Sequence, residues 1–294
     1  MNPILSSEMR PDMISPCIPV LGRFGLGTGT LASLGRAASL PEVSGLLDEM
    51  EINELRTIDT ADCYGSGDCE RLLGKAMAGR RSKFSLITKG GIRYGNLPGP
   101  LRPFNQFLKK GIQKLGYRQC FESFYLRKCL DQSLRRLGSE QVEAFLLHDP
   151  SAEVASSSEI AELFFSIKQQ GKAGFTGVSS GDTDVLRAAI SNAACDLIEC
   201  PAHLRVPAAM LEIWEACQSR GIHVVGNYIF EPSALWLTGG NRLEAMRGSA
   251  GLLPDHATIL CGTKNPSHLR ASYQWALDPL PLTQAMRLRQ VESL

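Results

Sequence analysis

Residues 56–75 (RTIDTADCYGSGDCERLLGK) combine two side chains that can exchange protons with a glycine-rich turn. Asp59 ends a short apolar stretch, and the phenol of Tyr64 follows five positions later. Both groups donate or accept hydrogen bonds according to their protonation. If 56–59 is a strand and 68–78 a helix, these two side chains lie where the strand ends. Active sites of parallel α/β proteins gather at that edge, so the turn is a candidate catalytic segment.

Short apolar runs with the same character recur along the chain and predict eight buried strands. They are 24–28, 57–59, 84–88, 142–147, 174–179, 196–200, 223–226 and 258–261. Helical patterns alternate with these runs, and the clearest are 41–55, 68–78, 127–137, 158–170, 184–194 and 208–220. Strict alternation implies parallel βαβ units. Eight such units in one domain of this size favour an α/β fold of the (β/α)8 TIM-barrel type over an open doubly wound sheet.

One large domain is expected from 294 residues of ordinary globular composition. Residues 1–19 contain several Pro and Ser and are expected to be a loose lead-in, 20–278 the barrel, and 279–294 a C-terminal tail. The stretch 90–122 is too long for a simple connection and contains several Gly and Pro. We therefore expect a long loop after the third strand, where loops shape active sites.

Charge and cysteine usage exclude some classes of function. The formal net charge is +1, which gives no overall attraction to nucleic acid or to an acidic membrane. The nine cysteines form no C-x-x-C pair, which favours reduced thiols in a cytoplasmic protein. No stretch approaches the ~20 apolar residues that a membrane helix needs, and the N-terminus lacks an apolar signal core. We expect a soluble, cytoplasmic protein with no nucleic-acid or membrane partner.

Several motifs, in order along 21–269, resemble those of the aldo-keto reductase family. They are the D-x-A-x-x-Y-G…E-x-x-L-G signature at 59–74, an S-T-K-like strand end at 86–89 (LITK), an S-L-x-x-L-G…L-L-H segment at 133–148, and a G-K-x-x…G-V-S-N segment at 171–180 (GKA…GVSS). Each motif alone is a weak signal. Their joint occurrence, each at the end of a predicted strand, makes the resemblance specific.

The resemblance implies a catalytic tetrad at Asp59, Tyr64, Lys89 and His148. Such a tetrad assists hydride addition to a carbonyl, whose oxygen develops negative charge and needs a proton donor beside it. Tyr64 supplies the proton in this interpretation. A free Tyr has a pKa of about 10, and the Lys89 ammonium is expected to lower it. Asp59 would hold that lysine, and His148 would orient the substrate oxygen through an imidazole N–H.

Each of these four residues has a structural alternative when it is taken singly. An Asp at a strand end is often a helix N-cap, and a Tyr there is often a packed aromatic at the rim. A Lys after an apolar strand is usually solvated, and a single His is often hydrogen-bonded structure. Their joint placement after the second, third and fourth strands favours catalysis. No close His/Cys cluster has zinc-ligand spacing, so no metal is expected.

For the cofactor, the resemblance implies NADPH (NADP+ when oxidised), bound in extended form across the barrel mouth. No G-x-G-x-x-G fingerprint follows a strand, which argues against a Rossmann domain. A barrel whose last βα loop holds the phosphates fits better. Lys264 and His268 are the expected partners of a 2′-phosphate, although a turn that caps a helix would look similar. The matching positions are Thr28, Gly29, Ser179, Ser180, Glu199, Asn227, Gly262, Thr263, Lys264 and His268.

Some positions depart from the family pattern and are expected to alter cofactor affinity. Glu199 stands where the family usually has a Gln that hydrogen-bonds the nicotinamide carboxamide, and Ser180 replaces an Asn. Residues 271–272 replace a Glu-Asn pair that contacts adenine. After the seventh strand the family's A-Y-S-P-L is altered, so either Asn227 or Tyr228 is expected to face the nicotinamide ring.

Two functions from different classes follow from these observations. The first is an NADPH-dependent oxidoreductase that reduces an aldehyde or ketone to an alcohol, with a small-molecule carbonyl as its partner. The second is a nicotinamide-binding regulatory or sensor protein on the same barrel, with little turnover. The complete tetrad favours the enzyme. A cofactor-free lyase or isomerase that uses Lys89 or His148 as a base would leave the phosphate loop unexplained. The sequence indicates neither the substrate, nor the physiological direction, nor the oligomeric state.

The long loop concentrates positive charge, because it contains no Asp or Glu between positions 90 and 120. Its cations are expected to bind or steer an anionic group on the substrate, first Arg93 and Arg102 near the start of the loop. The alternative is a solvated basic helix around 104–115. The cations are Arg93, Arg102, Lys109, Lys110, Lys114 and Arg118, and the aromatic residues expected to wall the site are Tyr94, Phe104, Phe107 and Tyr117.

Overall fold

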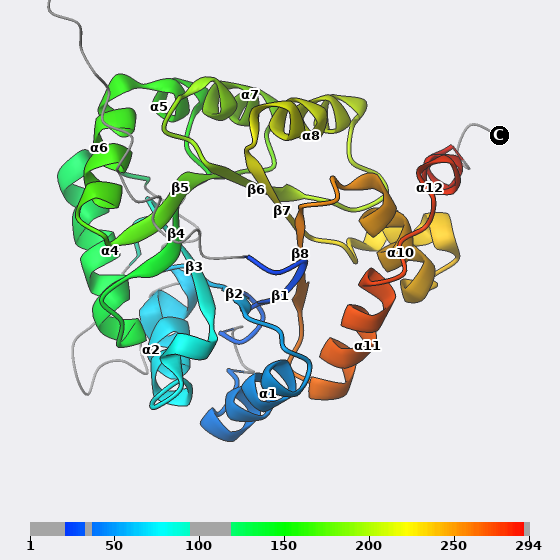
Figure 1. Ribbon diagram of the computed structural model, residues 1–294, viewed down its shortest axis with the longest axis horizontal. Helices are drawn as coiled ribbons and strands as arrows, with labels where there is room; N and C mark the ends of the chain where they lie inside the picture. The colour runs from blue at the N-terminus through cyan, green and yellow to red at the C-terminus, as the bar shows by residue number, and fades with distance from the viewer. Residues whose placement is uncertain (1–20, 33–36, 95–118, 291–294) are drawn as a thin grey trace, which may run out of the picture.

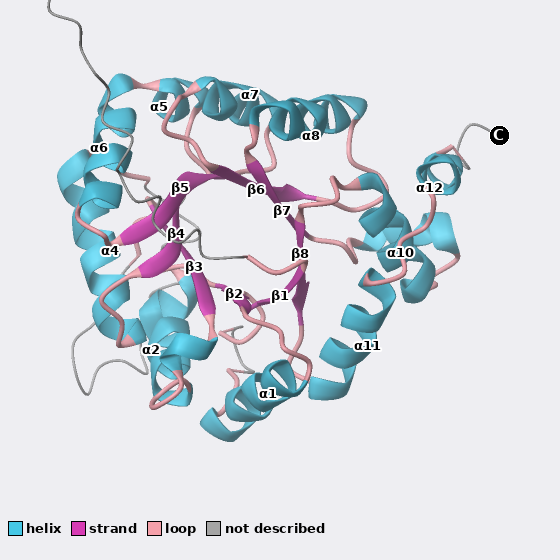
Figure 2. Ribbon diagram, in the orientation of Figure 1, coloured by secondary structure: helices cyan, strands magenta, loops and turns pink. Residues whose placement is uncertain are grey.

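The computed structural model describes residues 21–32, 37–94 and 119–290, and there it confirms the predicted (β/α)8 barrel. Eight parallel strands pair in sequence order, and the first also pairs with the last, which closes the sheet. Figure 2 shows them as a central ring inside a layer of helices. The strands are β1 (Phe24–Gly27), β2 (Thr57–Asp59), β3 (Ser85–Gly90), β4 (Val142–His148), β5 (Ala173–Ser179), β6 (Leu197–Pro201), β7 (His223–Asn227) and β8 (Thr258–Gly262).

Helices alternate with the strands and cover the outside of the ring (Figure 1). The longer ones are α1 (Leu40–Ile52), α2 (Asp68–Ala76), α4 (Ser123–Leu137), α6 (Ser158–Gln169), α7 (Thr183–Ser191), α8 (Ala208–Arg220), α10 (Arg242–Leu252), α11 (Pro266–Ala276) and α12 (Leu282–Arg289). Shorter pieces are α5 (Ala152–Ser156), α9 (Pro232–Leu235), η1 (Tyr64–Gly67), η2 (Arg81–Lys83) and η4 (Trp236–Thr238).

The ends of the helices follow local sequence. Ser39 caps α1 and exchanges hydrogen bonds with Glu42, which satisfies backbone N–H groups that the first turn leaves open. Helices α4 and α8 end at Gly138 and Gly221, where φ is 63° and 69°. Glycine adopts this left-handed conformation at no steric cost.

Two layers of apolar side chains hold the barrel together. The larger layer lies between the strands and the surrounding helices. The smaller layer fills the barrel itself and consists of Leu21, Ile87, Ala144, Leu146, Leu197, Val225 and Leu260. The interior is thus a packed core and not a channel, as in other barrels of this type. Asp59, Lys89 and His148, three of the four residues predicted to be catalytic, lie at or next to the ends of their strands.

The loop predicted after β3 falls mostly on 95–118, outside the described residues, together with the cations from Arg102 to Arg118. Its two ends lie side by side, because Ile92 forms an antiparallel bridge with Gln119 and the Cys120 N–H donates to the Gly91 carbonyl at 2.8 Å. Residues 91–92 and 119–120 therefore lie together next to β3.

The eight described cysteines are all buried thiols rather than disulfides. Burial is the main cause that raises the pKa of Cys69 to about 11 and of Cys200 to about 12. These thiols behave as small apolar side chains of the core. Within 21–32, 37–94 and 119–290, no helix has both the length and the apolar character to cross a bilayer.

Candidate active site

The four residues predicted to be catalytic come together at the ends of three neighbouring strands. Asp59 is the last residue of β2, Lys89 is the second to last of β3, and His148 is the last of β4. Tyr64 begins η1, directly after β2. The Lys89 ammonium donates to the Asp59 carboxylate and, at 3.0 Å, to the backbone carbonyl of Thr60. A fully buried ammonium is thus held by a buried carboxylate.

Tyr64 and His148 lie above this ion pair with defined ring orientations. The Lys89 Nζ is 5.6 Å from the centroid of the Tyr64 ring. The rings of Tyr64 and His148 meet edge to face, with centroids 6.1 Å apart and an interplanar angle of 83°. Burial, with Lys89 in addition, lowers the pKa of His148 to about 3. The imidazole is therefore neutral at pH 7 and keeps one N–H to donate.

The turn that presents Tyr64 adopts a left-handed backbone at three consecutive residues. The φ angles are 58° at Gly65, 57° at Ser66 and 86° at Gly67. Glycine tolerates this region, whereas Ser66 is strained there and is held by burial. An added Cβ at Gly67 would lie 3.0 Å from the side chain of Arg136. The sequence G-S-G therefore fixes how the chain passes from Tyr64 into α2.

A buried polar chain connects α2 to the strand that presents Lys89. Glu70, on α2, is fully buried and accepts from Arg136 at 2.6 Å and from the Thr88 hydroxyl at 2.7 Å. Thr88 directly precedes Lys89 in β3. The helix that follows the Tyr64 turn and the strand of Lys89 are thereby braced together, which keeps the phenol and the ammonium in a fixed relation.

Glu199 brings a second carboxylate to Lys89, a contact that the sequence analysis missed. Glu199 lies on β6, across the barrel from β2 (Figure 1), and its side chain is buried. Its Oε2 is 3.1 Å from the Lys89 Nζ, and its Oε1 accepts from the Asn227 amide at 2.8 Å. The sequence analysis placed Glu199 at the cofactor but had no signal for a contact between residues 110 positions apart. Only closure of the barrel brings these strands face to face.

Burial and the two carboxylates near Lys89 shift the pKa of Tyr64 in the direction opposite to the predicted one. Lys89 has the largest single influence on Tyr64 and lowers its pKa, as predicted. Burial, together with the carboxylates of Asp59 and Glu199, outweighs Lys89, so the pKa lies above its ordinary value. The predicted lowering of the Tyr64 pKa is therefore wrong. Burial and Glu199 likewise raise the pKa of Asp59. Burial alone would lower the pKa of Lys89, but the carboxylates of Asp59 and Glu199 outweigh it and raise that pKa.

Four of the predicted cofactor positions border this cluster. Thr28 is buried, and its hydroxyl donates to the Asp59 carbonyl at 2.8 Å. An added Cβ at Gly29 would lie 3.6 Å from the Tyr64 ring, so only a small residue leaves the phenol open on this side. Ser179 pairs in register with His148, and both Ser179 and Ser180 are buried.

The predicted phosphate loop, 262–268, joins β8 to α11. Asn265 caps α11, since its side chain accepts from the Ser267 N–H at 2.9 Å. Lys264 lies close enough to Glu42 to lower the pKa of that carboxyl, although Ser39 is the main cause of the shift. His268 is exposed on α11. The loop thus presents one half-buried and one exposed basic side chain beside a helix N-terminus, where phosphate groups bind.

The opposite side of the mouth offers buried acceptors and an exposed aromatic ring. Among the described residues, the buried Asn227 Oδ1 accepts no hydrogen bond, and the buried Glu199 Oε2 lies 3.1 Å from the Lys89 ammonium without meeting the geometry of a hydrogen bond. A buried acceptor in this condition requires a donor, and the amide of a nicotinamide carboxamide is one. Tyr228 follows β7 with φ of 53° and is 70% exposed. These features fit a nicotinamide group at the ends of β6 and β7.

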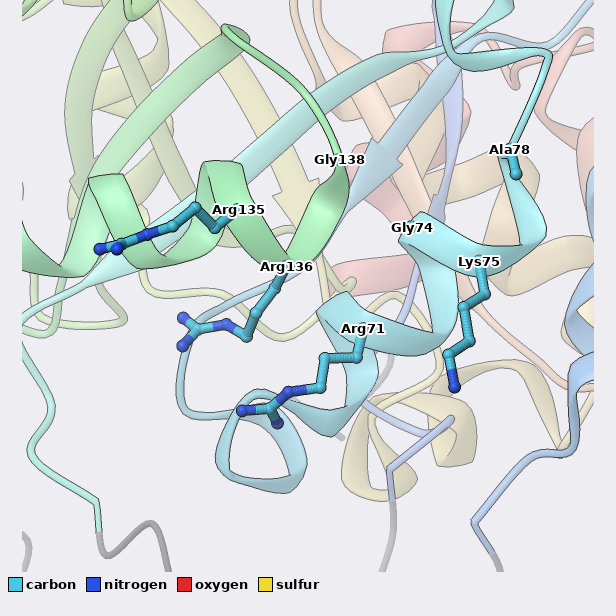
Figure 3. Close-up of a pocket in the computed structure, with 7 residues that line it drawn as sticks. All are labelled: Arg71, Gly74, Lys75, Ala78, Arg135, Arg136 and Gly138. Atoms are coloured by element: carbon cyan, nitrogen blue, oxygen red, sulfur yellow. The ribbon is translucent and has the colours of Figure 1, made fainter. Parts of the chain in front are cut away.

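Two other features were tested as sites. Within the described ranges, no group of three or more His, Cys, Asp or Glu side chains is placed to hold a metal ion. A pocket of about 590 Å³ between α2 and α4, outside the barrel, contains none of the four predicted catalytic residues (Figure 3). Two of its cations are paired, Arg71 with Asp68 at 2.8 Å and Arg136 with Glu70. It is lined by Arg71, Gly74, Lys75, Ala78, Arg135, Arg136 and Gly138.

Fold and cluster together define a barrel protein that gathers a phenol, an ammonium and an imidazole at the ends of its strands. The model of the Aldo/keto reductase family matches residues 23–247, and the chain belongs to that family. D-threo-aldose 1-dehydrogenase of Pseudomonas sp is 27% identical over 246 residues, which are 78% of this chain and 71% of that protein.

Two further comparisons are consistent with this assignment. An uncharacterized oxidoreductase of Bacillus subtilis (strain 168) is 30% identical over 142 residues, but the match spans only 47% of this chain and 43% of that relative. A solved aldo/keto reductase from Klebsiella pneumoniae, in complex with NADP and acetate, superposes with a TM-score of 0.67 and 18% identity, covering 92% of this chain and 91% of that one. At this identity the superposition supports the fold alone.

Proposed function

We propose that the protein is an NADPH-dependent oxidoreductase that reduces an aldehyde or ketone to an alcohol, with Tyr64 as the proton donor. The observation that supports this function best is the buried pair of Lys89 and Asp59, with Tyr64 and His148 directly beside it. A buried ammonium next to a phenol is an arrangement for moving a proton, since it stabilises the phenolate that donation leaves behind. NADP in the Klebsiella relative agrees with the cofactor.

Each of the four residues has a role in this chemistry. NADPH, when bound, supplies the hydride. The neutral His148 imidazole donates an N–H to the carbonyl oxygen and orients it, while Tyr64 transfers its proton to that oxygen as negative charge develops. The raised pKa of Tyr64 is compatible with donation, because an alkoxide is a stronger base than a phenolate. Asp59 holds Lys89 below the phenol so that the ammonium stabilises the phenolate.

A screen of aldehydes and ketones, followed by NADPH consumption, tests the proposal. We expect saturable turnover with at least one carbonyl class, and tight NADPH binding by fluorescence titration of the same preparation. Cofactor binding without turnover of any carbonyl would assign the protein to the nicotinamide-sensing class instead. Absence of both binding and turnover would contradict the cofactor assignment altogether.

Lys264 is expected to give the protein a preference for NADPH over NADH. An ammonium gains more from a dianionic 2′-phosphate than from a hydroxyl, so Lys264→Ala should reduce the ratio of kcat/KM for NADPH to that for NADH about 10-fold or more. The measurement is steady-state kinetics with both cofactors. Arg56→Ala, which removes a charge from an exposed residue before β2, should leave the ratio unchanged. An equal ratio in Lys264→Ala and wild type places the phosphate elsewhere.

Arg93 is the one described cation of the basic loop, and it lies with its guanidinium 5.3 Å from the centroid of the Tyr125 ring. If it steers an anionic substrate, kcat/KM for a carboxylated aldehyde should exceed that for its neutral analogue and fall as ionic strength rises. Arg93→Ala should reduce this difference several-fold, whereas Arg56→Ala should not. Equal kcat/KM for both aldehydes at all salt concentrations would show that Arg93 is solvated surface.

A further inference from the structure

Lys89 is surrounded by more negative charge than it can neutralise. Two carboxylates, Asp59 and Glu199, contact one ammonium, and all three side chains are buried. Desolvation makes such a surplus costly, so the cluster holds its protons tightly. Burial and Glu199 both raise the pKa of Asp59, which is the sign of this surplus.

Glu199 is fixed in its position by its own neighbours. Its Oε1 accepts from the Asn227 amide at 2.8 Å, which turns Oε2 toward the Lys89 Nζ at 3.1 Å. A Gln has nearly the same shape and lacks the charge, but it replaces one acceptor oxygen by an NH2 donor, so it can accept from Asn227 and cannot also accept from Lys89. The charge of this side chain, and not its size, is therefore what distinguishes the cluster electrostatically.

We propose that Glu199 is a positioning residue that acts through Lys89: by sharing the ammonium with Asp59, it limits how strongly Lys89 stabilises the phenolate form of Tyr64. Tyr64 consequently keeps a donatable proton to more alkaline pH than it would beside a single carboxylate. This inference rests on the proposed function, because it assigns Tyr64 as the acid. It concerns the residues of this chain only and is independent of which carbonyl is reduced.

The charged groups around the cluster shift the pKa of Tyr64 in opposite directions. Asp59 on β2 and Glu199 on β6 favour the protonated phenol, and Lys89 on β3 favours the phenolate. His148 on β4 is neutral, because its pKa is about 3. Burial raises the pKa of Asp149, which follows β4, and Glu199 adds to this rise. Removal of the Glu199 charge thus leaves Lys89 with one carboxylate partner, so the ammonium stabilises the phenolate of Tyr64 more strongly.

The test is the pH dependence of carbonyl reduction in Glu199→Gln. In wild type, kcat/KM falls at alkaline pH when Tyr64 loses its proton; in the variant this fall should occur at least about 1 pH unit lower. Glu199→Asp retains the charge and should fall at the same pH as wild type. Glu212→Gln, on the exposed face of α8, is the matched surface control. An alkaline fall at the wild-type pH in Glu199→Gln overturns the inference.

A second measurement uses the protein without cofactor and separates this inference from the proposed function. The pKa of Asp59 is raised in the folded state, so its contribution to stability is complete below the unfolded value near 4 and is lost as pH rises. Glu199→Gln removes one cause of the raised pKa and should weaken the decline of Tm between pH 5 and 8. If no carbonyl is reduced, the proposed function fails. An unchanged decline of Tm in Glu199→Gln overturns the inference, whether or not a carbonyl is reduced.

Discussion

Tyr64→Phe is expected to lower kcat/KM for carbonyl reduction at least about 100-fold while NADPH affinity stays nearly unchanged. The substitution removes the hydroxyl that we propose gives the proton. It keeps the ring that packs edge to face with His148 and lies 5.6 Å from Lys89 Nζ. The loss should therefore appear in the chemical step and not in folding.

Steady-state turnover and fluorescence titration of NADPH on one preparation measure the two quantities. Tyr273→Phe is the matched control, because that phenol lies against Phe24, 5.7 Å between ring centroids, on the outside of the barrel. It should keep wild-type turnover and affinity. Wild-type turnover in Tyr64→Phe would remove this residue from the role of acid, whatever the affinity for NADPH.

Lys89→Met is expected to abolish reduction and to destabilise the folded protein as well. It leaves Asp59 and Glu199 buried without their cation, and removal of one partner from a buried ion pair typically costs about 3–5 kcal/mol. Both carboxyls would then need to bind protons in the folded state. The variant should therefore be closest to wild type in Tm at pH 5 and lose most of its stability by pH 8.

A double variant separates the two effects of Lys89. Lys89→Met with Glu199→Gln carries one fewer buried carboxylate and should recover part of the Tm lost at pH 8, without any recovery of reduction. Thermal melting at both pH values and the NADPH assay provide the data. If the double variant melts no higher than Lys89→Met at pH 8, the unpaired Glu199 carboxylate is not what destabilises Lys89→Met.

Local patterns in the sequence contained most of the information about the strands. The predicted strand 57–59 has the same bounds as β2, and the predicted strand 142–147 lacks only the last residue of β4, His148. Parallel strands are buried on both faces and therefore appear as continuous apolar runs, which end where the polar mouth begins. The bounds of helices were less accurate: α7 ends at Ser191, three residues before its predicted end, and α4 begins at Ser123, four residues before its predicted start.

Helix α10 shows why some elements were not recognised. Its sequence, RLEAMRGSAGL, has no stripe of large apolar residues. Gly248 and Gly251 instead allow close packing: an added Cβ would lie 2.9 Å from the Leu204 side chain at the first and 2.1 Å from the Leu280 carbonyl at the second. Helices that pack through small residues lack the periodic signal on which the prediction depends.

The candidate site divides in the same way into local and distant parts. Asp59, Tyr64, Lys89 and His148 each end or follow one strand, so a motif could place them, and the structure brings all four together. Their roles remain predictions. The second carboxylate on Lys89 could not be predicted, because it depends on how far side chains reach across the closed barrel. The sign of the Tyr64 pKa shift depends on burial first and then on Asp59 and Glu199, and the depth of burial is likewise set only when the barrel closes.

The buried cysteines can be used to measure how often parts of the folded barrel open transiently. A thiol reagent reaches a buried cysteine only when the surrounding structure separates. Cys63 and Cys69 lie on either side of the η1 turn that presents Tyr64, whereas Cys200 and Cys217 lie in β6 and α8. The ratio of the modification rates at the first pair to those at the second therefore measures how often the turn that carries Tyr64 opens while the rest of the barrel stays folded. No label needs to be engineered for this measurement.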